Sequence, residues 1–343
     1  MKDFPEILGN EELRSRLASD IREDMFSHAY IIEGPLGCGK HTLAYEIAAA
    51  LSCEHASDTD VSLPCRLCSA CRKILGRKSP DVTVISRDDG KAQLGVDKIR
   101  ALREDVRYLP NDLERKVYII EDAHTMNVQA QNAFLLTLEE PPKYVLFLLL
   151  CETSAPLLET VRSRAPRLRM STLPDNEVRS FLLRGDSTAA ALEKESPDEF
   201  DEIIKLASGS IGKAQTLLDP KKREPLLAAR HLAKDFLTAL PQRKRGKEAI
   251  LLLGRFSQKR DELTGQLSET ELAVRDLILV KKSETVPLSF FTSEDEASEL
   301  AFRYKTSTLM KITEAIATAK ERLSRNSNIR LTLYALAADC GLL

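Results

Sequence analysis

A glycine-rich segment between a short apolar strand and an apolar-periodic helix constrains this chain more than any other feature. Residues 29–32 are apolar, residues 42–51 follow with helical periodicity, and between them lies the spacing Gly-x4-Gly-Lys, made by Gly34, Gly39 and Lys40 with Gly37 inside it. Glycines let successive backbone N–H groups wrap around phosphate oxygens, and the helix N-terminus adds partial positive charge. The spacing predicts a phosphate-binding loop; a glycine-rich turn with a surface lysine is the alternative.

Short apolar strands alternate with helical segments through the first half of the chain. Buried-strand patterns recur at residues 81–85, 116–120 and 145–150, and residues 96–108 carry apolar side chains at helical intervals. Such alternation implies crossover connections and a parallel sheet covered by helices on both faces. We therefore predict an α/β fold for this half.

Helical patterns replace strand patterns from about Leu173 onward. Pro174 precedes an acidic helix start, and residues 198–208 form a short amphipathic pattern that ends at Gly209. The polar, proline-bounded segment 220–225 is interpreted as a linker. We expect three domains, namely an α/β domain over 1–170, a small helical domain over 171–220 and an all-helical domain over 221–343.

Composition restricts the classes of protein to consider. With 43% hydrophobic and 30% charged residues among 343, the chain can bury sizeable cores and is too apolar for an intrinsically disordered protein. Its 50 basic and 52 acidic residues give a formal charge of −2, so contact with nucleic acid must come from a local patch or from partners. The absence of Trp argues against a base-stacking surface.

Nothing in the sequence indicates export or membrane insertion. The apolar run at residues 145–151 is too short to span a bilayer, and the amino-terminal residues lack the apolar core of a signal peptide. Seven cysteines in such a chain indicate metal ligands or free thiols rather than disulfides. We therefore expect a cytoplasmic protein without membrane contacts.

The residue after Lys40 departs from the usual phosphate loop. Ser or Thr normally stands there and binds Mg²⁺ through its hydroxyl, whereas this chain has His41. Imidazole is a poor ligand for Mg²⁺, which demands oxygen in tight octahedral geometry. Thr42, one place later, is expected to point elsewhere on the helix. We therefore expect a site that binds nucleotide phosphates but positions the metal poorly.

Two acidic residues, Glu121 and Asp122, follow the apolar strand at 116–120. Acids at this place form the second half of a phosphate-loop ATPase site, where the first holds Mg²⁺ and the second polarises the attacking water. The usual order is Asp then Glu. Asp122 is therefore shorter than the usual water-positioning residue, and a displacement near 1 Å can cost about a hundredfold in rate. The alternative is that these acids only cap the following helix.

Four of the cysteines are grouped with the spacing of a metal site. Cys65, Cys68 and Cys71 are separated by two residues each, and Cys53 can return as the fourth ligand. Four thiolates make a closed tetrahedral zinc site, which is structural because no position is left for water. An iron–sulfur cluster is the other interpretation of such spacing, and zinc is favoured because nothing else in the chain suggests electron transfer.

Two arginines, Arg162 and Arg164, flank Ser163 beyond the apolar strand at 145–150. An arginine on such a loop can enter the ATP site of a neighbouring subunit, where its fixed charge stabilises the transferring phosphoryl group. From these residues alone, a solvated surface arginine is the simpler interpretation.

Together these elements resemble the bacterial clamp loader of DNA polymerase III, within the AAA+ ATPase superfamily. The resemblance covers the first half of the chain and is carried most specifically by the four-cysteine insert, residues 53–78, and by the run Leu-Glu-Glu-Pro-Pro at 138–142. Residues 9–11, 27–30 and 326–331 also match the family, as does the Ser163-Arg164 pair. The family's Ser-Arg-Cys is Ser-Arg-Ala here, and the arginine remains.

The resemblance implies an AAA+ domain over 1–170, a helical lid over 171–220 and a helical oligomerisation collar over 221–343. In this family the gamma/tau motor hydrolyses ATP, whereas the delta-prime stator supplies an arginine finger to its neighbour. His41, the Glu121-Asp122 order and Gly212, which stands where the motor has a sensor arginine, depart from the motor pattern. The run at 157–164 looks more like delta-prime.

The expectation is therefore a delta-prime-like stator whose Arg164 acts in trans, with structural zinc and with weak or absent ATPase activity of its own. ATP or ADP would bind with weak dependence on Mg²⁺. The implied partners are gamma/tau and delta subunits in a hetero-oligomeric ring, and the sliding clamp and primed DNA through the assembled complex. An ATP-hydrolysing gamma/tau-type motor is the alternative, and an unrelated phosphate-loop enzyme is a third. The sequence ends at Leu343, so we expect no tau-type extension.

Overall fold

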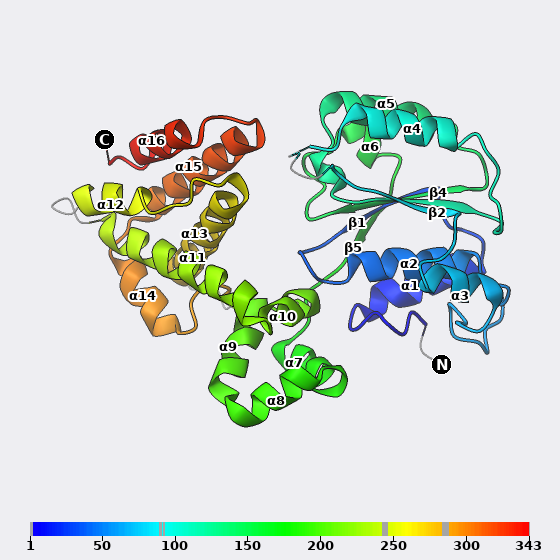
Figure 1. Ribbon diagram of the computed structural model, residues 1–343, viewed down its shortest axis with the longest axis horizontal. Helices are drawn as coiled ribbons and strands as arrows, with labels where there is room; N and C mark the ends of the chain where they lie inside the picture. The colour runs from blue at the N-terminus through cyan, green and yellow to red at the C-terminus, as the bar shows by residue number, and fades with distance from the viewer. Residues whose placement is uncertain (1–2, 89–90, 92, 242–245, 283–287, 343) are drawn as a thin grey trace. The chain divides into compact units, whose positions relative to one another are not determined.

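The chain divides into two compact units in the computed structural model, which describes residues 3–88, 91, 93–241, 246–282 and 288–342 (Figure 1). The first unit comprises Met1–Val178 together with Gly209–Lys213, and the second comprises Arg179–Ser208 together with Ala214–Leu343. The domain boundaries expected at 170 and 220 stay predictions, because this division follows other limits.

A five-stranded parallel sheet forms the centre of the first unit, which confirms the predicted α/β fold. Its order is β2-β3-β4-β1-β5, so β1 lies between β4 and β5. The last strand was not expected, because it is only three residues long and carries a single apolar side chain, Leu168. The strands are β1 (Ala29–Glu33), β2 (Val82–Ile85), β3 (Lys116–Ile120), β4 (Val145–Cys151) and β5 (Arg167–Arg169).

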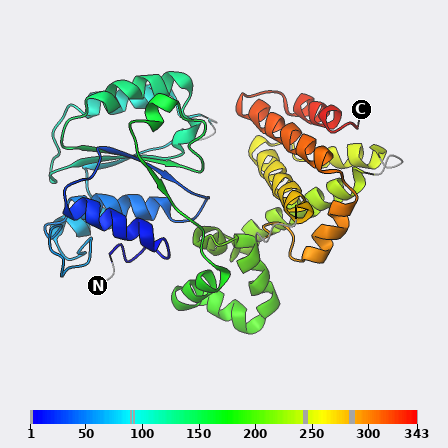
Figure 2. The ribbon, with the colours of Figure 1, turned by 180° about the vertical axis from the view of Figure 1, so that it is seen from behind.

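Helices cover both faces of this sheet, and two hydrophobic cores result. Along β4, Leu148 belongs to one core and its neighbour Phe147 to the other, because successive side chains of a strand point to opposite faces. A strand buried on both faces reads as a continuous apolar run. One face carries α1 (Glu11–Arg22), α2 (Lys40–Leu51) and α3 (Ser69–Leu75), and the other carries α4 (Val96–Asp105), α5 (Val128–Glu139) and α6 (Glu159–Arg162) (Figures 1 and 2).

The described residues of the second unit form helices and no strand, in agreement with the expected change of pattern after Leu173. Helix α7 (Asp175–Gly185) begins in the first unit, and α10 (Ile211–Leu217) also starts there. The others are α8 (Ser187–Glu195), α9 (Pro197–Ala207), α11 (Pro220–Ala239), α12 (Gly246–Leu253), α13 (Arg260–Lys281), α14 (Glu294–Phe302), α15 (Thr306–Ser324) and α16 (Ile329–Asp339).

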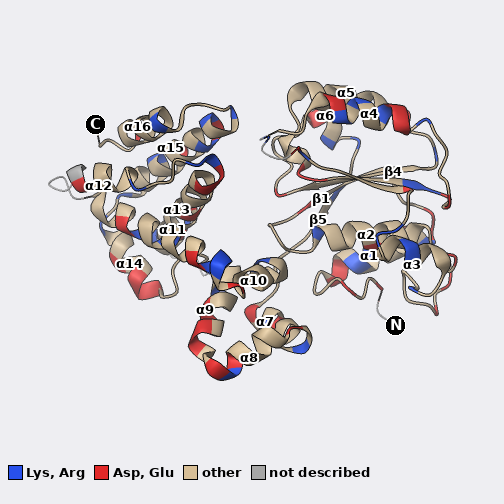
Figure 3. Ribbon diagram, in the orientation of Figure 1, with Lys and Arg blue, Asp and Glu red and all other residues tan. Residues whose placement is uncertain are grey.

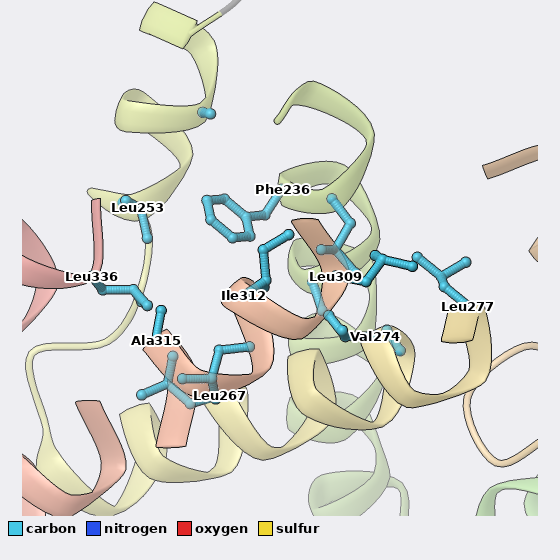
Figure 4. Packing of buried hydrophobic residues seen from close by; sticks show 14 of the residues in the cluster. Phe236, Leu253, Leu267, Val274, Leu277, Leu309, Ile312, Ala315 and Leu336 are labelled. Carbon is cyan, nitrogen blue, oxygen red and sulfur yellow. The ribbon is translucent and has the colours of Figure 1, made fainter. Parts of the chain in front are cut away.

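The carboxyl-terminal helices share one large core. Phe236 from α11, Leu277 from α13, Ile312 from α15 and Leu336 from α16 are each at most 1% exposed and lie in one cluster (Figure 4). Burying four such side chains stabilises the unit by about 1.5–3 kcal/mol each. The core accounts for the apolar periodicity of these helices.

The expected linker at 220–225 is wrong, because these residues form the first turns of α11. Asp219 caps the helix by accepting a hydrogen bond from the backbone N–H of Lys221, and Pro220 occupies the first helical position, which tolerates proline. Pro225 lies inside the helix and leaves the helix unbroken. Tertiary packing of α11 against α13 outweighs the missing N–H.

None of the described helices combines the length and the apolar character that crossing a membrane requires. Basic and acidic residues are interspersed along the helices of both units (Figure 3). This distribution agrees with the near-zero formal charge.

Candidate functional site

The predicted phosphate loop lies between the carboxyl end of β1 and the start of α2. Gly37 and Gly39 have φ angles of 75° and 99°, which favour glycine, and Gly39 caps α2. The ammonium group of Lys40 donates to the carbonyl oxygens of Gly34 at 2.7 Å and Pro35 at 2.8 Å. Lys40 is thus folded back over its own loop, and a phosphate would have to compete with these two carbonyls for its charge.

His41 lies beside the acid that would hold Mg²⁺. Its Nδ1 is 3.4 Å from Oε1 of Glu121, and both side chains are partly exposed. The two side chains that flank the metal position of an ATPase therefore meet each other, and one of them offers nitrogen where Mg²⁺ needs oxygen. Thr42 is exposed on the first turn of α2. The sequence shows His41 where Ser or Thr is usual, whereas its contact with Glu121 is visible only in the structure.

Asp122 is bound by an arginine. Its backbone adopts the left-handed conformation, with a φ of 47°, and its carboxylate accepts a hydrogen bond from Nη2 of Arg87 at 2.9 Å. The guanidinium occupies a carboxylate oxygen that a water-polarising residue would need for its water. This arrangement adds a second obstacle to the water-polarising role that the motif suggested.

Two further acids at this edge of the sheet were missed by the sequence analysis. Glu33 ends β1 and accepts a hydrogen bond from Oγ of Ser154 at 2.6 Å, and Glu152 follows β4 directly. Because carboxyl ends of parallel strands meet at one edge, Glu33, Glu121 and Glu152 all add negative charge beside the phosphate loop. An acid directly after a buried strand is the signal that would have found them.

His124 adds no positive charge to this edge. Burial lowers the pKa of His124, against the opposing influence of the Asp122 and Glu152 carboxylates, and so favours the neutral imidazole.

A segment far along the chain, Gly209–Lys213, packs on the phosphate loop within the same compact unit. Oγ of Ser210 donates to the carbonyl of Leu36 at 2.9 Å, and the backbone N–H of Gly212 donates to the carbonyl of Gly37 at 3.0 Å. A Cβ atom at position 212 would lie 3.0 Å from Cα of Gly37 and 3.1 Å from its carbonyl oxygen. A side chain at 212 would therefore press against the backbone of Gly37, which would have to shift by a few tenths of an ångström.

Replacing Gly212 with arginine, the residue that the motor pattern has there, should not create ATPase activity. The new Cβ must push against the backbone of Gly37, so we expect the chain to lose about 1–3 kcal/mol of unfolding free energy in urea titrations. Gly265→Arg is the matched control, because nothing lies within 4 Å of a Cβ at that helical position, and it should be neutral or stabilising. Unchanged stability together with a gain in ATP turnover for Gly212→Arg would contradict this account.

Arg164 follows the short helix α6, in the segment between β4 and β5. Its Nη1 donates to the carbonyl of Thr160 at 3.0 Å, and its Nη2 donates to Oε1 of Glu139 at 2.9 Å. The side chain is 35% exposed. Arg162, the other arginine of the motif, is also exposed. The structure thus places Arg164 on the surface of the first unit. It precedes β5, whereas the phosphate loop follows the carboxyl end of β1.

The four grouped cysteines form a buried cluster beside α2 and α3. Their sulfur atoms all lie within 4.8 Å of one another, and the sulfurs of Cys65 and Cys71 are 3.9 Å apart. A tetrahedral zinc ion with bonds of about 2.3 Å requires sulfur separations of about 3.8 Å. The four thiols therefore form a group that can hold a metal ion.

Backbone amides in the cluster favour thiolates. The N–H groups of Cys68 and Cys71 donate to the sulfurs of Cys65 and Cys68, each at 3.4 Å. Burial opposes ionisation of Cys65, but the amides of Cys68 and Leu67 and the neighbouring thiols outweigh it and lower its pKa to about 7. Burial raises the pKa of Cys53 and Cys71. A cation would reverse that penalty, because metal binding deprotonates thiols.

An arginine ties this cluster to the helix of the phosphate loop. Arg66 has a φ of 63° and donates to Oε1 of Glu6 at 2.9 Å and to Glu46, which α2 carries and which is 1% exposed. Burial raises the pKa of Glu46 to about 7, even though Arg66 acts in the opposite direction. The cysteine loop and α2 therefore hold one another in place.

The topology and this edge of the sheet define a class of protein. A parallel sheet in the order β2-β3-β4-β1-β5, a phosphate loop after β1 and acids after β3 are the arrangement of a phosphate-loop protein of the AAA+ class. The sequence-based prediction of this class is confirmed.

Comparisons with known proteins indicate which subunits this chain resembles. Residues 9–174 match a family model described as DNA polymerase III, delta subunit. The DNA polymerase III subunit tau of Bacillus subtilis is 33% identical over 217 residues, which are 63% of this chain and 37% of that protein. The gamma subunit of Buchnera aphidicola is 30% identical over 223 residues, which are 64% of this chain and 58% of that protein. The chain thus spans less than two thirds of the length of either relative.

These matches are to clamp-loader subunits of DNA polymerase III, the resemblance that the motifs predicted. Among solved structures, a gamma-subunit-related protein of Thermotoga maritima covers 94% of this chain and 98% of its own, with 20% identity and a TM-score of 0.42.

Proposed function

We propose that this chain is a delta-prime-type stator of the DNA polymerase III clamp loader and acts in the cytoplasm. It assembles with gamma/tau and delta subunits in a ring that loads the sliding clamp onto primed DNA. It hydrolyses little or no ATP itself and supplies Arg164 to the ATP site of a neighbouring subunit. Residues 171–220 serve as its lid and residues 221–343 as its collar in the ring.

The observation that carries this proposal is the contact between His41 and Glu121 at 3.4 Å. Phosphoryl transfer depends on a metal ion held by oxygen ligands beside the phosphate loop. Here the two positions concerned supply an imidazole and a carboxylate that engage each other. The Arg87 partner of Asp122 and the packing at Gly212 support the same reading, because each removes a further part of a hydrolytic site.

Zinc is the ion we propose for the four-cysteine cluster, bound by Cys53, Cys65, Cys68 and Cys71. Four sulfur donors with these separations suit a tetrahedral ion of zinc's size. A site closed by four thiolates leaves no position for water, so zinc would supply folding stability and no catalysis. The amides of Cys68 and Cys71 orient the sulfurs for this role.

An ATP-hydrolysing motor of the gamma/tau type is the second candidate. It is favoured by the identity with tau and gamma subunits and by the intact glycines and lysine of the phosphate loop. In that case ATP binding would have to displace His41 from Glu121 and Lys40 from its two carbonyls.

The isolated chain should show ATP turnover near background. Its defects affect the transition state more than ground-state binding, so weak binding of ATP or ADP through the loop amides and Lys40 can persist. A coupled ATPase assay and a fluorescent-nucleotide titration would measure the two properties separately. Lys40→Ala should weaken nucleotide binding without changing the background rate.

Turnover by the isolated chain at the rate of a clamp-loader motor, abolished in Lys40→Ala, would overturn the stator proposal in favour of the motor. The variant His41→Thr restores the usual type of residue after Lys40 and tests whether that change alone gives ATPase activity. We expect it to remain inactive, because Glu121 and Asp122 are still in the reversed order and Arg87 still binds Asp122.

A further inference from the structure

Arg164 is held on the surface of the first unit by two acceptors that come from different helices. One is the carbonyl of Thr160 in the preceding helix α6, and the other is the carboxylate of Glu139, the last residue of α5. We propose that Glu139 is a positioning residue, which orients the Arg164 guanidinium for insertion into a neighbouring ATP site. This inference rests on the proposed function of Arg164.

The hydrogen bonds to Thr160 and Glu139 leave N–H groups of the Arg164 guanidinium available for phosphate oxygens. A guanidinium has five N–H donors in a rigid planar fork. One donor on Nη1 binds Thr160 and one on Nη2 binds Glu139, so three donors are left for phosphate oxygens. The two hydrogen bonds restrict the rotamers of Arg164 before it meets a phosphate. Less side-chain entropy is therefore lost when the guanidinium enters a neighbouring site.

The frame that carries Glu139 is rigid. Helix α5 is anchored in the core by Phe134 and Leu138, which are 0% and 1% exposed. Gln131, also on α5 and 2% exposed, accepts a hydrogen bond from the backbone N–H of Leu158 at 2.7 Å, and its amide donates to the carbonyl of Pro156 at 3.4 Å. These bonds lock α5 to the segment that leads into α6, so the separation of the two acceptors is set by buried structure.

Glu139 is suited to orient the arginine without cancelling its charge. Its side chain is 47% exposed, so water screens its field at distances beyond the hydrogen bond itself. Such an exposed pair contributes little to folding, and its removal should therefore alter the finger and spare the fold. Glu140, the next residue, is equally exposed but belongs to the cap of α5, which makes it a matched control.

The experiment uses the complete clamp-loader complex reconstituted with wild-type chain, Glu139→Gln, Glu140→Gln, Arg164→Ala or the double variant Glu139→Gln/Arg164→Ala. DNA- and clamp-stimulated ATP hydrolysis gives kcat and KM, and gel filtration verifies assembly. We expect Glu139→Gln to lower kcat about threefold to tenfold with an unchanged KM for ATP. Glu140→Gln should behave as wild type, and the double variant should be no slower than Arg164→Ala alone.

The outcomes separate this inference from the function on which it rests. If Arg164→Ala lowers kcat but Glu139→Gln does not, Glu139 has no positioning role. The same conclusion follows if Glu139→Gln slows the Arg164→Ala complex by the factor seen in the wild type, because its effect would then bypass the arginine. If Arg164→Ala itself changes nothing, the in-trans function fails and the positioning role with it.

Discussion

A clamp loader assembled with the Arg164→Ala chain should hydrolyse ATP at least about tenfold more slowly in the presence of DNA and clamp. Arginine fingers are worth roughly 10³–10⁵ in rate in well-studied GTPases, and a ring in which one of several sites loses its finger retains part of its activity. Arg164 is 35% exposed and makes only surface contacts, so the variant should fold and assemble normally. Stimulated ATPase and clamp-loading assays on the purified complex measure the effect.

Two companion variants identify what Arg164 contributes. Arg164→Lys should not restore the rate, because a point charge cannot reproduce the planar fork. Arg162→Ala should leave it unchanged, since Arg162 is also exposed but has no proposed role. Normal loading of clamps onto primed DNA by Arg164→Ala complexes would return Arg164 to the status of an ordinary surface residue.

Removal of metal should loosen residues 53–78 while the parallel sheet stays folded. We expect about one zinc ion per chain, and binding at structural zinc sites supplies about 10–16 kcal/mol in small zinc-dependent domains. Cys68→Ser should therefore release the ion and lower the unfolding free energy of the cysteine loop by about several kcal/mol. Elemental analysis measures the metal, and hydrogen exchange measures loop and sheet separately.

Cys340→Ser is the matched control for that variant, because Cys340 is half-buried in the second unit and lies outside the cluster. It should keep the ion and the hydrogen-exchange protection of the loop. Iron in the purified protein, or an absence of metal after purification in reducing buffer, would contradict the zinc assignment.

Loss of the ion should also destabilise α2, the helix that follows the phosphate loop. Cys53 lies two residues beyond the end of α2, whose first residue is Lys40, and Arg66 ties the cysteine loop to Glu46 in the middle of the same helix. Removal of the metal should therefore lower the hydrogen-exchange protection of α2. Helix α4, on the opposite face of the sheet, should keep its protection.

Local patterns in the sequence were sufficient to predict the α/β fold, the glycine-rich loop between β1 and α2 and the grouping of the four cysteines. The continuous apolar run of β4 predicts a strand buried on both faces, because only such a strand can be apolar at every position. The Gly34–Lys40 spacing and the gaps between Cys65, Cys68 and Cys71 likewise carry their geometry within a few residues. Residues that are only a few positions apart in the chain must lie close together in space, so their spacing is enough to predict such features.

Contacts between residues far apart in the chain required the tertiary structure. His41 meets Glu121 because β1 and β3 flank β4 in the sheet, and Arg164 meets Glu139 because Gln131 fixes α5 beside the approach to α6. Pro225 sits inside a helix because α11 packs on α13, although local propensity indicates a break. In each case burial of apolar surface elsewhere decides which elements become neighbours, and hydrophobic burial is non-directional, so no local pattern encodes its partner.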